Sequence, residues 1–187
     1  MTQPFPEFLT NRFRMRRIKP SDIDRVYAGL SDAQVVAHYG VSYDSLDATQ
    51  EQMRWFDQLL DNKSGIWWGL ARLEDDLLMG ACGFNDWSHE HRQVHLGYWL
   101  LPEYWRQGLL REGLPFILRH AFQHMAVHRI HADVEPENIA SGALLRHLGF
   151  VHEGTLRDVE CKDGKFLSLE QYGLVSSDPA AIALTRQ

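Results

Sequence analysis

The chain lacks most of the features that mark secreted, disulfide-linked or membrane proteins. It contains only two cysteines, Cys82 and Cys161, which lie far apart and form no pair with metal-ligand spacing. We therefore expect two reduced thiols, as in a cytoplasmic protein. No apolar run approaches the ~18 residues that a membrane span requires. Residues 1–7 also lack the basic start and apolar run of a signal peptide, so we expect no membrane partner.

Clustered positive charge is also scarce. The chain carries 19 Lys and Arg residues against 25 Asp and Glu residues, a net charge of −6. Because nucleic-acid-binding proteins neutralise phosphates with clustered cations, this balance argues against nucleic acid as the main partner. It modestly favours cationic partners such as amines. Some of the ten histidines form close pairs, such as His89 and His91, but a metal site needs further converging ligands, and we expect none.

The composition is that of a globular protein, with 44% hydrophobic and 24% charged residues. The length suits a single domain over residues 1–187, with a core over about 9–175 and a loosely held tail over 176–187. Apolar patterning predicts strands at 13–18, 66–73, 77–84, 94–101, 130–134, 157–162 and 165–174. It predicts helices at about 22–30, 31–38, 46–60, 109–125 and 138–148, and a polar loop at 87–93. Asp163-Gly164 is typical of a hairpin turn.

The most informative stretch is residues 98–112, in which a strand-like run ends at Pro102 and a glycine-bearing turn leads into a helical pattern. The first N–H groups of a helix have no partners within the helix, and the helix dipole adds positive charge there. Gly108 allows close approach of the backbone, and Arg106 and Arg111 add charge. This pattern favours a cradle for a phosphorylated ligand, although an ordinary connection is the alternative. Pro115 should kink the following helix or make its first turn irregular.

A second segment, residues 135–150, indicates a strand end, a capped amphipathic helix and a glycine stop. Asn138 and Ser141 lie three residues apart, so they share one face of the first helical turn.

Together these segments resemble the GNAT acetyltransferase superfamily, and in particular its Rim-type branch of ribosomal-protein N-acetyltransferases. The resemblance extends over almost the whole chain. It includes Leu9–Arg16 as first strand, Pro20–Asp22 as the start of the first helix, Leu96–Leu100 with Trp105–Gly108 as fourth strand and pyrophosphate loop, Asn138–Phe150 as last helix, and Glu153–Arg157 with Gln171–Leu174 as the tail.

The resemblance implies an α/β (α+β) fold with a mixed, mostly antiparallel twisted sheet, a splayed parallel strand pair and flanking helices. A mixed sheet also agrees with the predicted order of strands and helices. The implied activity is acetyl-CoA-dependent N-acetylation of a primary amine, most readily a protein N-terminal α-amine. The alternatives are a small-amine acetyltransferase, for polyamines or aminoglycosides, and a non-catalytic acyl-CoA-binding module. The sequence does not indicate an oligomeric state.

The resemblance also assigns the cofactor-binding groups. The backbone of the strand Trp99, Leu100 and Leu101 should pair with the pantetheine arm. The pyrophosphate should lie against the loop N–H groups of Gln107, Gly108, Leu109, Leu110 and Arg111, with Arg106 beside it and Asn138 on the cofactor amides. The chain departs from the family pattern at Trp105, where Gln or Arg is usual, and at Leu110, where a small residue is usual.

The catalytic assignments follow the same pattern. Many family members donate a proton to the departing thiolate from a tyrosine, but the matching residue here is Leu145. We therefore expect Ser141 to be the acid, the alternative being a helix-capping role for Ser141 and Asn138. His95 stands where the family often has a base, and imidazole titrates near neutrality. The alternatives are a purely structural His95, Glu135 as the base, or a base role left to water.

The substrate pocket is the remaining assignment. Aromatic and amide side chains give a rigid amphipathic surface, or they belong to the core. The candidates are Tyr39, Phe84, Asn85, Trp87 and Trp99.

Overall fold

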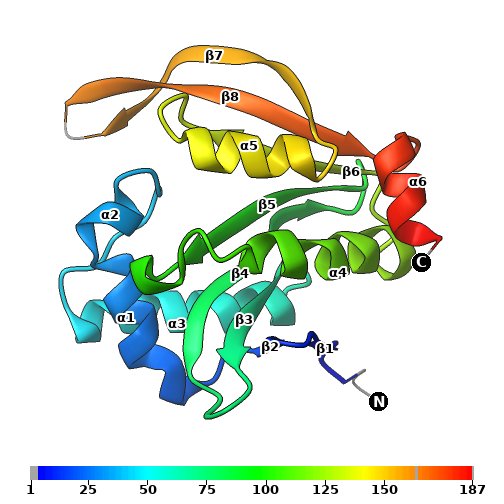
Figure 1. Cartoon of the computed structure of the whole chain (residues 1–187). Helices are drawn as coiled ribbons and strands as arrows, with labels where there is room; N and C mark the ends of the chain where they lie inside the picture. The colour runs from blue at the N-terminus through cyan, green and yellow to red at the C-terminus, as the bar shows by residue number, and fades with distance from the viewer. Residues whose placement is uncertain (1–3, 163, 187) are drawn as a thin grey trace. The chain divides into compact units, whose positions relative to one another are not determined.

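The computed structural model describes residues 4–162 and 164–186, and it has eight strands in one sheet (Figure 1). The strands are β1 (Phe8–Leu9), β2 (Phe13–Arg17), β3 (Ile66–Arg72), β4 (Leu78–Ser88), β5 (Gln93–Leu100), β6 (Arg129–Val134), β7 (Val151–Lys162) and β8 (Lys165–Val175). Their order is β1-β2-β3-β4-β5-β6-β8-β7. Strands β5 and β6 are parallel, while the β1–β2, β2–β3, β3–β4, β6–β8 and β7–β8 pairs are antiparallel. This confirms the expected mixed, mostly antiparallel sheet with one parallel pair. The splaying of that pair stays a prediction.

The helices follow the predicted pattern closely. They are α1 (Ile23–Leu30), α2 (Ala33–Val36), α3 (Leu46–Asp61), α4 (Leu109–His124), α5 (Ile139–His147) and α6 (Pro179–Thr185), with short 3-10 helices η1 (Pro20–Asp22) and η2 (Pro102–Tyr104). None of the helices in the described part of the chain is long and apolar enough to cross a membrane.

The chain divides into two compact units. Unit 1 comprises residues 1–86 and 97–114, and unit 2 comprises residues 87–96 and 115–187.

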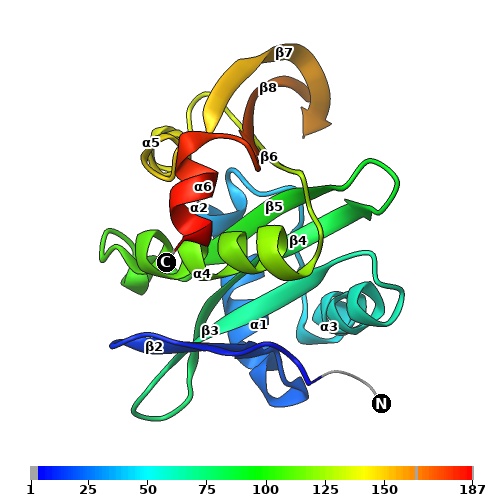
Figure 2. The same cartoon turned by 90° about the vertical axis from the view of Figure 1, so that its right-hand side faces the viewer.

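The core of unit 1 lies where α1 and α3 pack on its sheet. Helix α3 buries Thr49, Gln52, Phe56 and Leu59, a spacing of three and four residues that defines one helical face. Phe56 packs against the Trp67 ring of β3 at 5.7 Å between centroids, and Figure 2 shows α3 beside β3. Trp99 of β5 joins the same cluster.

A buried tyrosine joins helix α5 to strand β8 in unit 2. Tyr172 of β8 is fully buried, and its hydroxyl donates to Glu170 at 2.9 Å and accepts from Arg146 of α5 at 2.6 Å. A Cβ at Gly142 would lie 3.1 Å from this hydroxyl, so the glycine lets α5 approach β8 closely. Helix α5 therefore lies alongside the curved β7–β8 hairpin (Figure 1).

Several local expectations need correction. The tail is not loosely held, because α6 forms there, buries Ala181, and offers the Leu184 carbonyl to Arg119 at 2.9 Å. The predicted polar loop is shorter than expected, because β4 continues through Trp87 to Ser88. Helix α4 includes Pro115, whose missing N–H leaves the Arg111 carbonyl without its helical donor, and the expected kink or irregular first turn stays a prediction. The predicted turn includes Asp163, which lies outside the described residues.

The buried ion pair between Arg16 and Asp22 should dominate the electrostatic stability of unit 1. Arg16 is 2% exposed and donates two hydrogen bonds to Asp22, at 2.8 and 3.0 Å. Asp22→Asn should lower the free energy of unfolding by about 3 kcal/mol, the low end for breaking a buried pair, because Asp76 still contacts Arg16. Asp57→Asn, which breaks the exposed pair with Arg17, should cost less than ~1 kcal/mol. Urea denaturation measures both, and equal losses would contradict the argument.

Candidate functional site

The turn between β5 and α4 aims unpaired backbone N–H groups away from the helix. Arg106 and Gly108 both have left-handed backbones, with φ of 59° and 75°. The first bond of α4 runs from the Glu112 N–H to the Gly108 carbonyl at 3.0 Å. The N–H groups of Gly108, Leu109, Leu110 and Arg111 thus precede the first helical donor and form the free end of the helix. This is the geometry that binds anions.

Three side chains hold this turn in place. Arg12, which directly precedes β2, donates to the Gln107 carbonyl at 2.8 Å and to the Glu112 carboxylate at 2.7 Å. The Trp105 indole donates to the Leu100 carbonyl at 2.8 Å, and Gln107 donates to the Glu103 carbonyl at 2.8 Å. Leu109 is 4% exposed and anchors the start of α4 in the core. The backbone of the turn is therefore preorganised.

The charges of the turn remain available for a ligand. Arg106 and Arg111 are exposed, and neither guanidinium has an ionic or hydrogen-bond partner among the described residues. Arg12 offsets the negative charge of Glu112 in the first helical turn. The local field at the helix end is therefore positive.

We expected the backbone of Trp99, Leu100 and Leu101 to pair with the pantetheine arm, and the contacts of β5 correct this expectation. The Leu101 N–H donates to the Met79 carbonyl of β4 at 3.0 Å. A Cβ at Gly80 would lie 2.3 Å from the Trp99 carbonyl oxygen, which places that carbonyl against β4 as well. Because successive residues of a strand point their backbone groups to opposite edges, Leu100 faces away from β4. Of the three predicted residues, only Leu100 faces away from β4, and because its carbonyl accepts from the Trp105 indole, its N–H is the group that can serve a further extended partner.

The predicted residues of unit 2 lie on α5, β5 and β6. Asn138 caps α5, with its Oδ1 accepting from the Ser141 N–H at 3.2 Å. Ser141 is partly buried in the first turn of α5. Leu145 is fully buried, so the position of the family's tyrosine is here a core position. The capping role of Asn138 is thus present, and any chemical role of Ser141 comes in addition to it.

His95 belongs to a polar cluster on the parallel pair. It stands opposite His131 in the β5–β6 register, and the two imidazole rings stack with centroids 5.0 Å apart. Its Nε2 lies 3.7 Å from Oδ2 of Asp133, and each side chain is 28% exposed. A histidine with a carboxylate neighbour can hold and release a proton.

The predicted substrate residues have different environments. Phe84 is fully buried, with its ring at right angles to Trp68, so it is a core residue and we withdraw it as a substrate contact. Tyr39 packs on the unit 1 core, and desolvation raises the pKa of its hydroxyl. Asn85 donates to Asp86 at 2.7 Å, and the Trp87 ring lies at a tilt against the His89 ring, with centroids 4.3 Å apart. These three remain candidates.

Sequence reasoning missed three features of the site. Arg12 supports the turn from a position about 100 residues earlier in the chain, and no local pattern signals it. A shorter separation, from position 95 to position 133, likewise hides Asp133 as the neighbour of His95. The indole N–H groups of Trp67 and Trp99 are buried and have no hydrogen-bond partner among the described residues. A buried donor without a partner is costly, so such donors suggest a ligand position.

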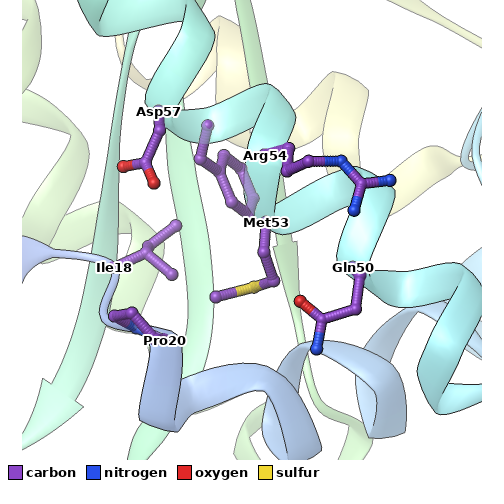
Figure 3. Close-up of a pocket in the computed structure, with 7 residues that line it drawn as sticks. Ile18, Pro20, Gln50, Met53, Arg54 and Asp57 are labelled. Carbon is purple, nitrogen blue, oxygen red and sulfur yellow. The ribbon is translucent and has the colours of Figure 1, made fainter.

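A separate cavity of about 150 Å³ lies between η1 and α3 (Figure 3). Its lining consists of Ile18, Pro20, Gln50, Met53, Arg54, Phe56 and Asp57. None of the predicted site residues contributes to it. No group of three or more His, Cys, Asp or Glu side chains able to hold a metal ion occurs in residues 4–162 and 164–186.

Comparison with known proteins gives consistent results. A family model described as an acetyltransferase (GNAT) domain matches residues 12–151. An uncharacterized N-acetyltransferase, YoaA from Bacillus subtilis (strain 168), is 31% identical over 172 residues, which cover 91% of this chain and 97% of that protein. The ribosomal protein uS5-alanine N-acetyltransferase of Escherichia coli (strain K12) is 30% identical over 104 residues, 55% of this chain and 54% of that protein.

A solved structure shares the fold. The spermidine N-acetyltransferase from Vibrio cholerae, in complex with CoA and spermine, superposes with a TM-score of 0.80 at 18% sequence identity. The match covers 90% of this chain and 98% of that one.

Proposed function

Since the chain belongs to the GNAT acetyltransferase family and is an N-acetyltransferase, we propose that it transfers the acetyl group of acetyl-CoA to a protein N-terminal α-amine. The single observation that carries the cofactor half of this proposal is the preorganised turn before α4. The acceptor half rests on the donors of the unit 1 core and on the partial match to a ribosomal-protein enzyme. With such an acceptor, the proposed reaction takes place in the cytoplasm.

The residues of the turn fit a pyrophosphate. Four backbone N–H groups converge at the start of α4, and the exposed guanidinium groups of Arg106 and Arg111 have no other described partner. Backbone donors and a helix dipole stabilise a phosphate without ordering a long side chain. In this proposal the Leu100 N–H hydrogen-bonds the pantetheine arm, and Asn138 contacts the amides of that arm.

Acetyl transfer requires two proton movements. The acceptor nitrogen attacks the thioester carbonyl carbon, a C–N bond forms, the C–S bond breaks, and the sulfur leaves with its electron pair. His95 takes the proton that the nitrogen loses. Ser141 gives a proton to the departing sulfur and regains one from water. Acid and base groups positioned in this way typically contribute 10²–10⁴-fold to the rate.

The acceptor proposal draws on hydrogen-bonding chemistry. A peptide has carbonyl oxygens that accept hydrogen bonds, whereas a protonated polyamine has donors only. The indole N–H groups of Trp67 and Trp99 are donors without described partners. A ligand that reaches these buried N–H groups must offer hydrogen-bond acceptors, which a peptide backbone has and a protonated polyamine lacks.

The turn itself can be tested through its glycine. Gly108→Val should raise the Kd of acetyl-CoA about tenfold, or about 1.4 kcal/mol, because the left-handed backbone strains and the close approach is lost. Gly164→Val is a matched control, since Gly164 has the same φ of 75° and no atom within 4 Å of its added Cβ. Calorimetry should show wild-type affinity for the control. Unchanged affinity in folded Gly108→Val would refute the assignment.

The proposed acid acts only when the C–S bond breaks. Ser141→Ala should therefore lower kcat on the order of 10²-fold while changing the Kd of acetyl-CoA less than about twofold. The Asn138 cap uses the backbone N–H of Ser141 and survives this substitution. Stopped-flow kinetics and calorimetry measure the two quantities. Full kcat in the variant would leave Ser141 with a structural role alone.

A comparison of several amine acceptors tests the proposed class of substrate. Purified protein with acetyl-CoA should acetylate unblocked peptides at the α-amine, with kcat/KM at least about tenfold above that for spermidine or an aminoglycoside. A peptide with a blocked N-terminus but a free lysine serves as the matched control and should not react. Mass spectrometry identifies each product. Preference for spermidine would overturn the acceptor assignment, and absence of turnover would leave a CoA-binding module.

A further inference from the structure

We propose that the cavity between η1 and α3 binds a small organic acid, whose apolar ring or short branched chain lies inside the cavity and whose carboxylate lies at Arg54. The lining residues all belong to unit 1, and none of them is assigned to acetyl transfer. The inference is therefore independent of the proposed function.

One face of α3 forms most of the cavity wall. Four lining residues recur at the spacing of a single helical face, namely Gln50, Met53, Arg54 and Asp57. Ile18, just after β2, and Pro20 of η1 lie across from this face (Figure 3). The three polar side chains of the face are exposed, so they border the cavity instead of filling it.

The floor of the cavity is apolar. Ile18 and Phe56 are 6% and 8% exposed, so a ligand that contacts them is largely removed from water. The volume of about 150 Å³ has room for a body the size of benzene. The Met53 thioether points toward Ile18 and Pro20 (Figure 3), and an unbranched, flexible side chain adapts to the shape of a ligand. The floor therefore favours a single ring or a short branched chain.

The rim of the cavity supplies the polar contacts. The Asp57 carboxylate accepts from Arg17 at 2.7 Å, so its charge is already offset. Arg54 and Gln50 have neither an ionic nor a hydrogen-bond partner among the residues that the structure describes. Figure 3 shows their head groups on the same side of Met53. The uncommitted charge at the rim is thus positive, and it lies on the same side as an amide donor.

These features define the chemical class of the ligand. A carboxylate accepts hydrogen bonds from a guanidinium and from an amide, and the bonds to the guanidinium are charge-assisted. An ammonium group would meet the like charge of Arg54, and the carboxylate of Asp57 is already engaged by Arg17. A neutral molecule of the same shape keeps the apolar contacts and loses the charged one. The best fit is a monocarboxylate with one small apolar body.

Methyl NMR tests the site directly, with benzoate as the probe. Benzoate should shift the ε-methyl resonance of Met53, identified by its absence in Met53→Leu, until the site is saturated. The methyl resonances of Ile18 should shift with the same Kd. Benzyl alcohol should bind about fivefold more weakly, the size expected for the loss of one partly exposed charge contact, and benzylamine more weakly still.

Two arginine variants separate the charged contact from the apolar ones. Arg54→Gln should raise the Kd of benzoate about fivefold and change that of benzyl alcohol less than about twofold, because only the acid uses the guanidinium. Arg14→Gln is the matched control, since Arg14 is another exposed arginine of unit 1 and does not line the cavity. It should bind benzoate as the wild type does.

The results contradict the proposal in distinct ways. The absence of a saturable shift at Met53 and Ile18 would overturn the site itself. Equal affinity for benzoate and benzyl alcohol, tighter binding of benzylamine, or an unchanged benzoate Kd in Arg54→Gln would overturn the assignment to an acid. The titrations contain no acetyl-CoA, so their outcome does not depend on whether the protein acetylates any amine.

Discussion

The backbone of the turn between β5 and α4 is the constraint on which the site depends. A helix end binds an anion only when its N–H groups point outward from a rigid support. The rigidity here comes from a left-handed Gly108, a buried Leu109 and the guanidinium of Arg12, which bonds to both sides of the turn. The proposed binding groups are main-chain atoms, so their positions follow from the fold rather than from side-chain rotamers.

The distribution of cations explains why this turn remains positive in an acidic protein. In unit 1, Arg16 is committed to Asp22 and Asp76, Arg25 to Glu103, and Arg12 to Glu112. These pairs stabilise the fold and contribute little to the local field. Arg106 and Arg111 have no such partner among the described residues. A net negative chain can therefore still present a local anion site, because the field at short range depends on unpaired charges.

In unit 2, several charged side chains are paired with one another on one face of the strands. The face that carries His95 has its charges arranged in pairs along neighbouring strands, with Arg129 on Glu153 and Asp133 beside His95. Two glycines make close packing possible, since Gly142 lets Tyr172 approach α5 and Gly173 lets the ion pair cross β8. Capping by Asn138 and any chemistry of Ser141 share one helical turn.

Local patterns in the sequence were sufficient to predict most helices, the glycine turn and the Asn138 cap, because each depends on neighbours within a few residues. The mixed sheet followed from the order of the predicted elements and from the family resemblance. The tertiary structure decided the rest. It committed Leu101 to β4, placed Phe84 in the core, folded the C-terminal residues into α6, and brought Arg12 and Asp133 to their partners. The physical reason is that strand edges, register and ion pairs depend on residues distant in the chain, whose proximity no local pattern encodes.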